Sequence, residues 1–439
     1  MAKIAFLGAG STVFARNVLG DCMCSKALES YEIALYDIDG ERLKQSEAIL
    51  KALNAGQGGK AVVRSYLGVE QRRAALAGAQ FVVNAIQVGG YEPATVIDFE
   101  IPKKYGLRQT IADTLGIGGI LRALRTIPVM EDFARDIEAV CPDAWLLNYT
   151  NPMAILSGYM QRYTGVKTVG LCHSVQVCSE HLLRSLGMED KLEGRIERIA
   201  GINHMAWLLE IRDARGQDLY PEIKKRAKEK NMKEKHGDMV RFDYIDKLGY
   251  YCTESSEHNA EYNPFYIKSR YPHLIDDFNI PLDEYPRRCI RQIEGWTEEY
   301  RQLAGESKLL HQRSKEYASH IMEAVVTGTP YKIGGNVLNR GFIENLPREA
   351  CVEVPCLVDK NGVTPCYAGS LPPQLAAMNM SNINVQLLTI EAAHTRKREH
   401  IYHAAMMDPH TGAELSLDDI WKMVDELIDA HGKMLPAFK

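Results

Sequence analysis

With 439 residues, the chain is longer than one hydrophobic core usually supports, so we expect two closely packed domains. Its net charge of −5 gives no reason to expect a nucleic-acid or membrane partner. The ten cysteines are scattered and make no disulfide framework, and the first residues lack an apolar signal segment. We therefore expect a cytoplasmic protein that acts on a small molecule.

The N-terminal stretch has the pattern of a dinucleotide-binding unit. An apolar strand at 3–7 precedes a glycine turn and a helical pattern to about residue 23, and a second strand at 32–36 ends in an acid. Such glycines let the backbone approach a pyrophosphate, and the acid accepts ribose hydrogen bonds and repels a 2′-phosphate. Val13 stands in the place of the third glycine of the fingerprint. We predict an NAD⁺ site formed by Gly8, Gly10, Ser11, Thr12 and Asp37.

Strands alternate with helices as far as about residue 171, which predicts a parallel sheet. Apolar runs at 81–86, 144–147 and 166–171 predict strands, and a helix is expected at 120–140. Beyond about residue 195 the pattern favours antiparallel strands at 195–200 and 205–211, a hairpin with a strand at 350–358 and a turn at 359–362, and helices near 311–326 and 415–431. We predict an α/β fold: a Rossmann-like, doubly wound domain in 1–195 and an α+β domain in 196–439. This two-lobed architecture is that of lactate and malate dehydrogenases.

A cysteine and a histidine follow directly after the strand at 166–171. Cys172 and His173 leave its carboxyl end, where open α/β sheets bind ligands, and His204 follows about thirty residues later. One thiolate and one imidazole are too few for a structural zinc site but suit a catalytic metal with open coordination positions. A buried cysteine is, however, often only a small hydrophobic residue. The residues alone leave both interpretations open.

Three more polar segments surround these residues in the expected topology. Asn148 and Asn151 follow the strand at 144–147, where Asn151 either caps the next helix with Pro152 at its first position or binds substrate. Asp113 lies in a polar loop before the helix at 120–140. The segment 249–262 holds three carboxylates, one imidazole and several phenols, which indicates either acid/base chemistry or a polar helix start.

The chain resembles glycoside hydrolase family 4 over nearly its whole length, and most closely the α-galactosidase branch of that family. The segments that carry this resemblance are Gly8–Thr12, Val88–Pro93, Asp113–Gly116, Asn148–Pro152, Cys172–Val175, Gly201–His204, Glu254–His258 and Ala405–Pro409. The family is an exception to the usual two-carboxylate scheme of glycosidases.

The resemblance implies hydrolysis by redox chemistry without net oxidation. NAD⁺ oxidises C3 of the sugar, a base removes the C2 proton, the C1–O1 bond breaks by elimination, water adds, and the hydride returns. Mn²⁺, held by residues matching Cys172 and His204, chelates the C2 and C3 oxygens. Asn151 matches a sugar-contacting residue, and we include Asn148 and Asn203 as substrate-binding candidates.

The acid and the base are assigned by resemblance as well. His173 stands where phospho-glucosidase relatives carry an acidic proton donor, so His173 is our candidate acid, with Asp113 as a partner. Relatives take the base from the region matching 250–262, where Glu257 is our first candidate and Glu254, His258 and Tyr262 are alternatives.

The expected substrate is an unphosphorylated α-galactoside. The loop at 91–95 lacks the arginine of the 6-phosphosugar enzymes. The alternatives are an α-galacturonide, an α-glucoside, or a different activity as a 2-hydroxy-acid dehydrogenase, whose lobes are similar but which needs no metal cysteine. The resemblance also implies a homodimer or homotetramer.

Overall fold

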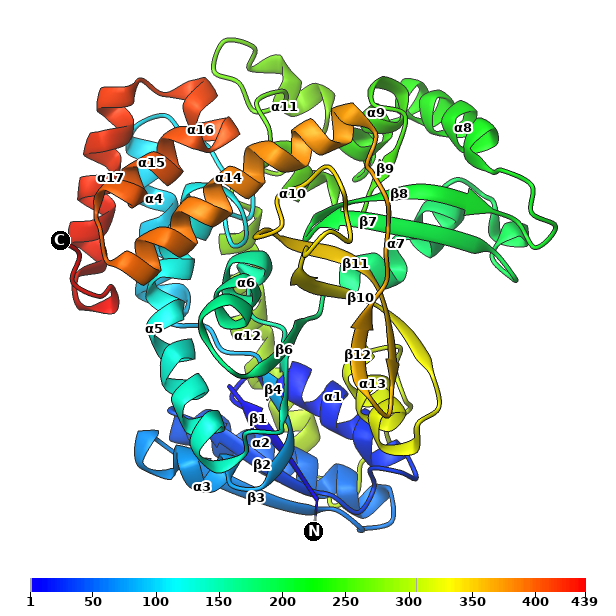
Figure 1. The fold of residues 1–439 in the computed structure, drawn as a ribbon, viewed down its shortest axis with the longest axis vertical. Coiled ribbons are helices and arrows are strands. Elements are labelled where there is room, and N and C mark those ends of the chain that lie inside the picture. Colours follow the sequence, from blue (N-terminus) through cyan, green and yellow to red (C-terminus); the bar gives the residue numbers. More distant parts are fainter. Residues whose placement is uncertain (1, 305) are drawn as a thin grey trace.

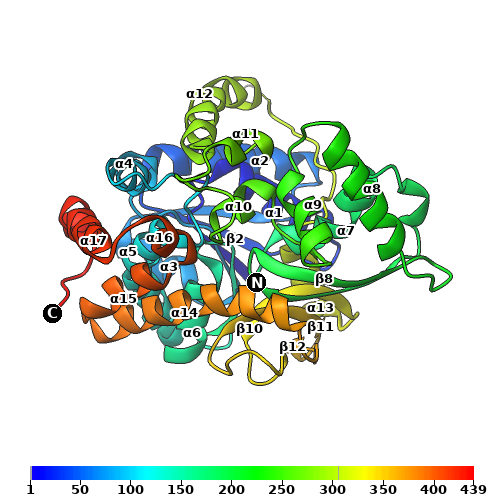
Figure 2. The same ribbon diagram turned by 90° about the horizontal axis from the view of Figure 1, so that it is seen from above.

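The computed structural model describes residues 2–304 and 306–439. These residues form one twelve-stranded sheet with helices on both faces (Figures 1 and 2). The sheet order is β3-β2-β1-β4-β5-β6-β10-β11-β7-β8-β9, and β12 pairs with β11. The strands are β1 Lys3–Leu7, β2 Glu32–Asp37, β3 Val62–Leu67, β4 Ala79–Asn84, β5 Trp145–Asn148, β6 Lys167–Gly170, β7 Ile196–Ile202, β8 Met205–Arg212, β9 Tyr251–Cys252, β10 Tyr331–Leu338, β11 Cys351–Asp359 and β12 Gly362–Pro365.

The first six strands are parallel and follow the Rossmann order. Both faces of β1 are buried: Ile4 and Phe6 pack in the core shared with α1 and α2, whereas Ala5 and Leu7 pack with α3 and α5. This explains why β1 is apolar at every position rather than at alternate ones. The helices of this half are α1 Thr12–Cys24, α2 Gly40–Gly56, α3 Arg72–Leu76, α4 Val96–Lys104, α5 Gly116–Val140, α6 Met153–Tyr163 and α7 His173–Ser185.

The second half continues the same sheet with antiparallel strands. Asn336 of β10 pairs with Gly170 of β6, and Glu353 of β11 pairs with Gly201 of β7. The predicted fold class, a Rossmann-like sheet joined to an α+β part, is confirmed. The remaining helices are α8 Tyr220–Lys233, α9 Met239–Lys247, α10 Ser256–Glu261, α11 His273–Asp277, α12 Glu284–Ala304, α13 Tyr317–Thr327, α14 Pro373–Thr395, α15 Glu399–Met407, α16 Pro409–Glu414 and α17 Leu417–His431.

Helices from the second half pack back onto the first. The long helix α14 crosses α5 and α6, and the C-terminal helix α17 lies beside α4 (Figure 1). On the opposite face, α13 contacts α1, and α12 contacts α2 through a hydrogen bond of 2.8 Å from Trp296 Nε1 to Gln45 Oε1. Helix α12 is thereby fixed over the parallel half of the sheet, although it lies some 250 residues further along the chain.

Three element boundaries differ from the sequence-based expectations. Helix α5 begins at Gly116 rather than Ile120, so Gly118 and Gly119 lie inside it. Glycine is required at 118 because a Cβ there would lie 2.3 Å from the Ala112 carbonyl oxygen. The absent side chains let the preceding polar loop pack against the helix. The helix expected from 311 begins at Tyr317, and Pro152 precedes α6 rather than occupying its first position.

Within the described part of the chain, every helix is too short or too polar to cross a membrane.

Candidate active site

The candidate site lies where the parallel strands end. Residues at the carboxyl ends of β1, β4, β5 and β6 pair in one row, Leu7 with Asn84, Asn84 with Asn148 and Asn148 with Gly170. The loops that leave these strands therefore start at the same edge of the sheet. They carry the glycine turn, the 85–95 loop, the Asn151 loop and Cys172.

The glycine turn is shaped for close contact with an anion. Gly8 has a φ of +87°, and a Cβ there would lie 2.6 Å from the Ala85 carbonyl oxygen. The backbone N–H of Gly10 donates to Asp37 Oδ2 at 2.6 Å, which fixes the acid at the end of β2 against the turn. Ser11 caps α1 without a side-chain bond, and its buried hydroxyl has no partner among the described residues. The open N–H groups of α1 and this free hydroxyl fit a phosphate.

Thr12 is the first residue of α1 and is buried beneath the turn. Its hydroxyl donates to the Gly10 carbonyl at 3.3 Å and accepts from Ser46 Oγ at 3.2 Å. Thr12 therefore supports the shape of the turn.

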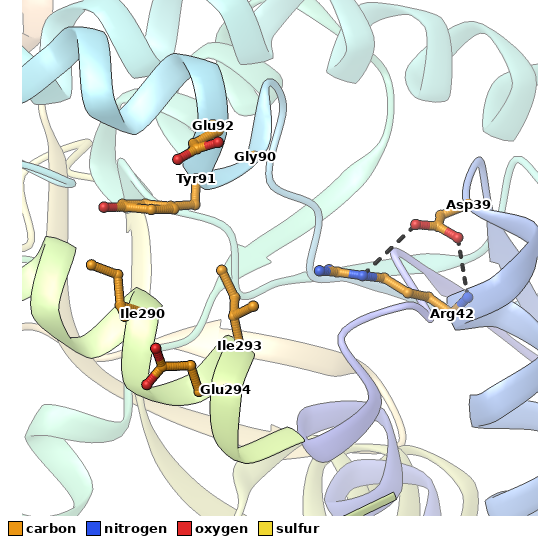
Figure 3. A pocket seen from close by; sticks show the side chains of 8 residues that line it. All are labelled: Asp39, Arg42, Gly90, Tyr91, Glu92, Ile290, Ile293 and Glu294. Carbon is orange, nitrogen blue, oxygen red and sulfur yellow. Dashed lines mark hydrogen bonds and ion pairs between the residues drawn. The ribbon is translucent and has the colours of Figure 1, made fainter. Parts of the chain in front are cut away.

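A pocket of about 530 Å³ lies beside the end of β2 (Figure 3). Its wall is made by the N-terminal part of α2, the loop after β4 and one face of α12. The side chains of Tyr91, Ile290 and Ile293 point toward one another across it, and Arg42 pairs with Asp39 at 3.7 Å on the opposite side. Its volume is that of a small-molecule site, and it has apolar surface for a flat base.

Cys172 and His204 come together from different halves of the chain. Cys172 directly precedes α7, and His204 stands in the β7–β8 turn with a φ of 64°. The Nδ1 atom of His204 shares a hydrogen bond of 3.1 Å with the Tyr262 hydroxyl, which leaves Nε2 to face the site. Ligand atoms of Cys172, His204 and Glu254 all lie within 4.8 Å of one another. This donor set fits a divalent metal ion.

The electrostatics of this group suit a metal. Burial lowers the pKa of His204, which favours the neutral imidazole that binds metals. Burial raises the pKa of the Cys172 thiol well above its usual range, with Glu353 and Glu254 adding to the effect, so the thiolate needs a positive charge nearby. Burial opposes ionisation of Glu254, but His258 and His204 outweigh it and lower its pKa to about 2.

A second polar group lies next to the first. Asp113 Oδ1 lies 4.0 Å from His258 Nε2, and Asp113 Oδ2 accepts a 3.2 Å hydrogen bond from the Asn151 amide. The His258 Nδ1 atom lies 2.7 Å from the Ser255 hydroxyl and 3.7 Å from Glu254 Oε1. Burial opposes ionisation of Asp113, but Arg122, His258 and His204 lower its pKa. The carboxylates and imidazoles thus form one connected cluster.

The loop that carries Asp113 is held by a carboxylate of α10. Glu261 Oε2 accepts from the Thr110 N–H at 2.7 Å, and Oε1 accepts from the Ala112 N–H at 2.8 Å, with the Ile111 N–H between them. Ala112 has a φ of 52°. Burial raises the pKa of Glu261 to about 7, although these backbone N–H groups oppose the shift.

Of four further predicted residues, two form ion pairs outside the Cys172–His204 pair and two are fully buried. Glu257 pairs with Arg288 of α12, away from the Cys172–His204 pair. His173 is half exposed, and its Nδ1 lies 3.1 Å from Glu316, whose carboxylate raises the pKa of the imidazole. Asn148 is fully buried and bonds Asn84, Ser157 and the Thr150 carbonyl. Asn203 is fully buried one residue before His204.

Sequence reasoning missed two buried acids. Glu353 lies in β11 between apolar residues, accepts from Asn336 Nδ2 at 2.9 Å, and has its pKa raised by burial to about 8. A lone acid inside the apolar run Val352–Val354 was the available signal. Glu261 was hidden because it lies in the same dense polar segment as Glu257.

Two protein-family models together match most of the chain. The model described as family 4 glycosyl hydrolase matches residues 3–188, and that of the family's C-terminal domain matches residues 199–411. The chain belongs to glycosyl hydrolase family 4. Within family 4, it is 61% identical to an α-galactosidase of Bacillus subtilis over all 439 residues, with 100% of both chains covered. It is 35% identical to an α-galactosidase of Rhizobium meliloti, covering 99% of this chain and 89% of the relative.

Solved structures agree on the fold. A putative glucosidase of Bacillus subtilis superposes with a TM-score of 0.86 at 25% identity, covering 97% of this chain and 99% of the other. A 6-phospho-α-glucosidase from gut microorganisms, solved with NAD and Mn²⁺, superposes with a TM-score of 0.80 at 20% identity and with full coverage of both chains. A Cryptosporidium parvum malate dehydrogenase superposes with a TM-score of 0.52 at 13% identity, covering 90% of this chain and 100% of the other. This chain thus shares its overall fold with that malate dehydrogenase.

Proposed function

We propose that this protein is an α-galactosidase that hydrolyses unphosphorylated α-galactosides with NAD⁺ and Mn²⁺ as cofactors. The observation that carries the proposal is the 61% identity with an α-galactosidase over the whole of both chains. The convergence of the glycine turn with the Cys172–His204 pair at one sheet edge supports it, because a hydrolase of another mechanism needs neither.

The residues fit both cofactors. The free Ser11 hydroxyl and the N-terminus of α1 fit a pyrophosphate, Asp37 fits the adenosine ribose, and Cys172 and His204 fit a divalent metal. When bound there, NAD⁺ would accept a hydride from C3 of the sugar and return it, and Mn²⁺ would stabilise negative charge on the sugar oxygens.

The geometry favours Tyr262 rather than Glu257 as the group that takes the C2 proton. Glu257 is neutralised by Arg288, whereas the Tyr262 hydroxyl lies 3.1 Å from His204 Nδ1. Burial raises the pKa of Tyr262 well above its usual value, so its phenolate form needs a hydrogen-bond donor. The N–H at Nδ1 of His204 supplies one, and Tyr262 then removes the proton next to the C3 carbonyl.

His173 remains our candidate for protonating the leaving oxygen. The Glu316 carboxylate raises the pKa of His173, which keeps the imidazolium that a proton donor needs. The half-exposed position of His173 suits contact with a variable leaving group. Asp113, Asn151 and His258 then orient the sugar hydroxyls, since they form a connected hydrogen-bonding surface beside His204.

The substrate assignment also follows from the loop after β4. Residues 91–95 of this loop include no arginine that could pair with a 6-phosphate on the sugar. We therefore expect the neutral galactoside to be preferred over its 6-phosphate.

The test is release of nitrophenol from an aryl α-galactoside, with NAD⁺, Mn²⁺ and a thiol omitted one at a time. We expect hydrolysis only when both cofactors are present, and little turnover of the 6-phosphate. Preference for an aryl α-galacturonide or α-glucoside would refute the substrate assignment. Oxidation of a 2-hydroxy acid without hydrolysis of any glycoside would replace the proposal with a dehydrogenase.

A further inference from the structure

We propose that Glu254 is a third protein ligand of the divalent metal, so that the site is Cys172, His204 and Glu254 rather than a cysteine–histidine pair. The inference rests on the metal site of the proposed function and deepens it. The evidence for it is the position of the Glu254 Oε2 atom beside His204.

The distances fit one shared ion. Glu254 Oε2 lies 3.5 Å from His204 Nε2, and the Cys172 Sγ atom lies within 4.8 Å of both groups. Donor atoms bound about 2.2 Å from an octahedral ion lie about 3 Å apart when adjacent and about 4.4 Å apart when opposite. Small side-chain adjustments therefore bring all three donors to one metal.

The two oxygens of Glu254 have different surroundings. Oε1 accepts from the Ser255 N–H at 2.8 Å and lies 3.7 Å from His258 Nδ1. Oε2 is the oxygen that faces His204. One oxygen thus anchors the side chain to its own helix start while the other stays directed at the site, which is the arrangement of a monodentate carboxylate ligand held by a neighbouring hydrogen bond.

The chemistry of the donors supports the same assignment. Mn²⁺ prefers oxygen ligands, and a thiolate alone is a soft partner for it. A carboxylate adds a hard donor, and with the thiolate it balances the two positive charges of the ion in a buried setting. Three protein ligands still leave positions for two sugar oxygens and a water, as catalytic metal sites require.

A second possible set of ligands is less suited to hold the metal. Donor atoms of Asp113, His204 and His258 also lie within 4.8 Å of one another. Both Asp113 oxygens, however, already accept hydrogen bonds, from Thr114 Oγ1 at 2.7 Å and from Asn151 Nδ2 at 3.2 Å, whereas one oxygen of Glu254 is directed at His204. This set also lacks the thiolate. We therefore assign Asp113 and His258 to the sugar and Glu254 to the metal.

The experiment compares metal binding by E254Q with that of the wild-type protein, with E257Q as the matched control three residues away. The glutamine oxygen can still accept from the Ser255 N–H, so the helix start is retained. Free Mn²⁺ is measured by electron paramagnetic resonance titration of the full-length protein, and NAD⁺ binding is measured in parallel. We expect Mn²⁺ binding to weaken at least about tenfold in E254Q, with E257Q and NAD⁺ binding unchanged.

Co²⁺ in place of Mn²⁺ gives a second readout that does not depend on activity. The sulfur-to-cobalt absorption should persist in E254Q, because Cys172 still binds, while the visible cobalt bands change with the lost oxygen ligand. Wild-type affinity and an unchanged cobalt spectrum in E254Q, with binding abolished in C172S, would overturn the role of Glu254 and leave the proposed function intact. Equal binding by wild type and C172S would overturn the metal site itself.

Discussion

Replacing Glu261 by glutamine tests whether a buried carboxylate holds the loop that carries Asp113. The carboxylate accepts from the Thr110 and Ala112 N–H groups at 2.7 and 2.8 Å through different oxygens. A glutamine keeps one acceptor and places its NH₂ group against the other donor. One buried N–H is then left unsatisfied, which costs about 2 to 3 kcal/mol. At about 0.9 kcal/mol per degree for 439 residues, the midpoint of thermal unfolding falls by about 2 to 3 °C.

The assay is thermal and urea unfolding at about pH 5 and about pH 8. Because burial raises the pKa of Glu261 to about 7, ionisation of Glu261 lowers the stability of the wild-type protein as the pH rises through 7, so the difference from E261Q should be larger at pH 5 than at pH 8. Hydrolysis should fall further than the loss of stability explains, because Asp113 moves relative to His258 and Asn151. The exposed Glu349→Gln change serves as the control and should alter neither quantity. An E261Q protein with wild-type midpoint and turnover would refute the structural role given to Glu261.

Three further changes test other parts of the structure. Cys172→Ser should abolish Mn²⁺ binding and hydrolysis while NAD⁺ affinity, measured by calorimetry, is retained; unchanged turnover would remove the metal from the mechanism. Asp37→Ala should weaken NAD⁺ binding about tenfold or more, since a ribose hydrogen bond to a carboxylate is lost, and equal affinity of the wild type for NADP⁺ would contradict this role. Asp21→Asn should lower the free energy of unfolding by about 2 kcal/mol, because fully buried Asp21 accepts from His311 Nε2 at 2.7 Å and the Ser314 N–H at 2.8 Å. Burial opposes ionisation of Asp21, but these hydrogen bonds lower its pKa below 3.8. The stabilisation by Asp21 is therefore present above pH 3.8, and the difference in unfolding free energy between the wild type and D21N must shrink as the pH falls below that value. A difference that grew in acid would contradict the assignment.

The parallel half of the sheet can be predicted from the sequence because its signals are local. Apolar runs bounded by glycine or polar turns predicted β1, β2, β4, β5 and β6, and the Gly8–Asp37 spacing predicted the unit they form. The boundary of α5 was misplaced because Gly118 and Gly119 look like a turn. Glycines stand inside that helix because the Ala112 carbonyl lies against Gly118 and the Thr114 carbonyl lies against Gly119.

The candidate site shows where local reasoning ends. The dense polar segment at 249–262 favours Glu257 as the base, but the pairing of Glu257 with Arg288 depends on α12. No local sequence pattern predicts that α12 lies beside this segment. Helix α12 also forms a wall of the pocket beside β2, through Ile290 and Ile293. The surroundings of Glu254 and Glu353 are likewise set by strands and turns far apart in the chain.

The most direct test of the central proposal is hydrolysis of an aryl α-galactoside in D₂O by protein freed of nucleotide and then supplied with NAD⁺, Mn²⁺ and thiol. We expect no release of nitrophenol until NAD⁺ is added, and galactose that carries deuterium at C2 afterwards, because Tyr262 exchanges the proton it has removed with solvent before C2 is reprotonated in the same turnover. Full hydrolysis by the nucleotide-free protein, with no deuterium at C2, would contradict hydrolysis through oxidation and elimination.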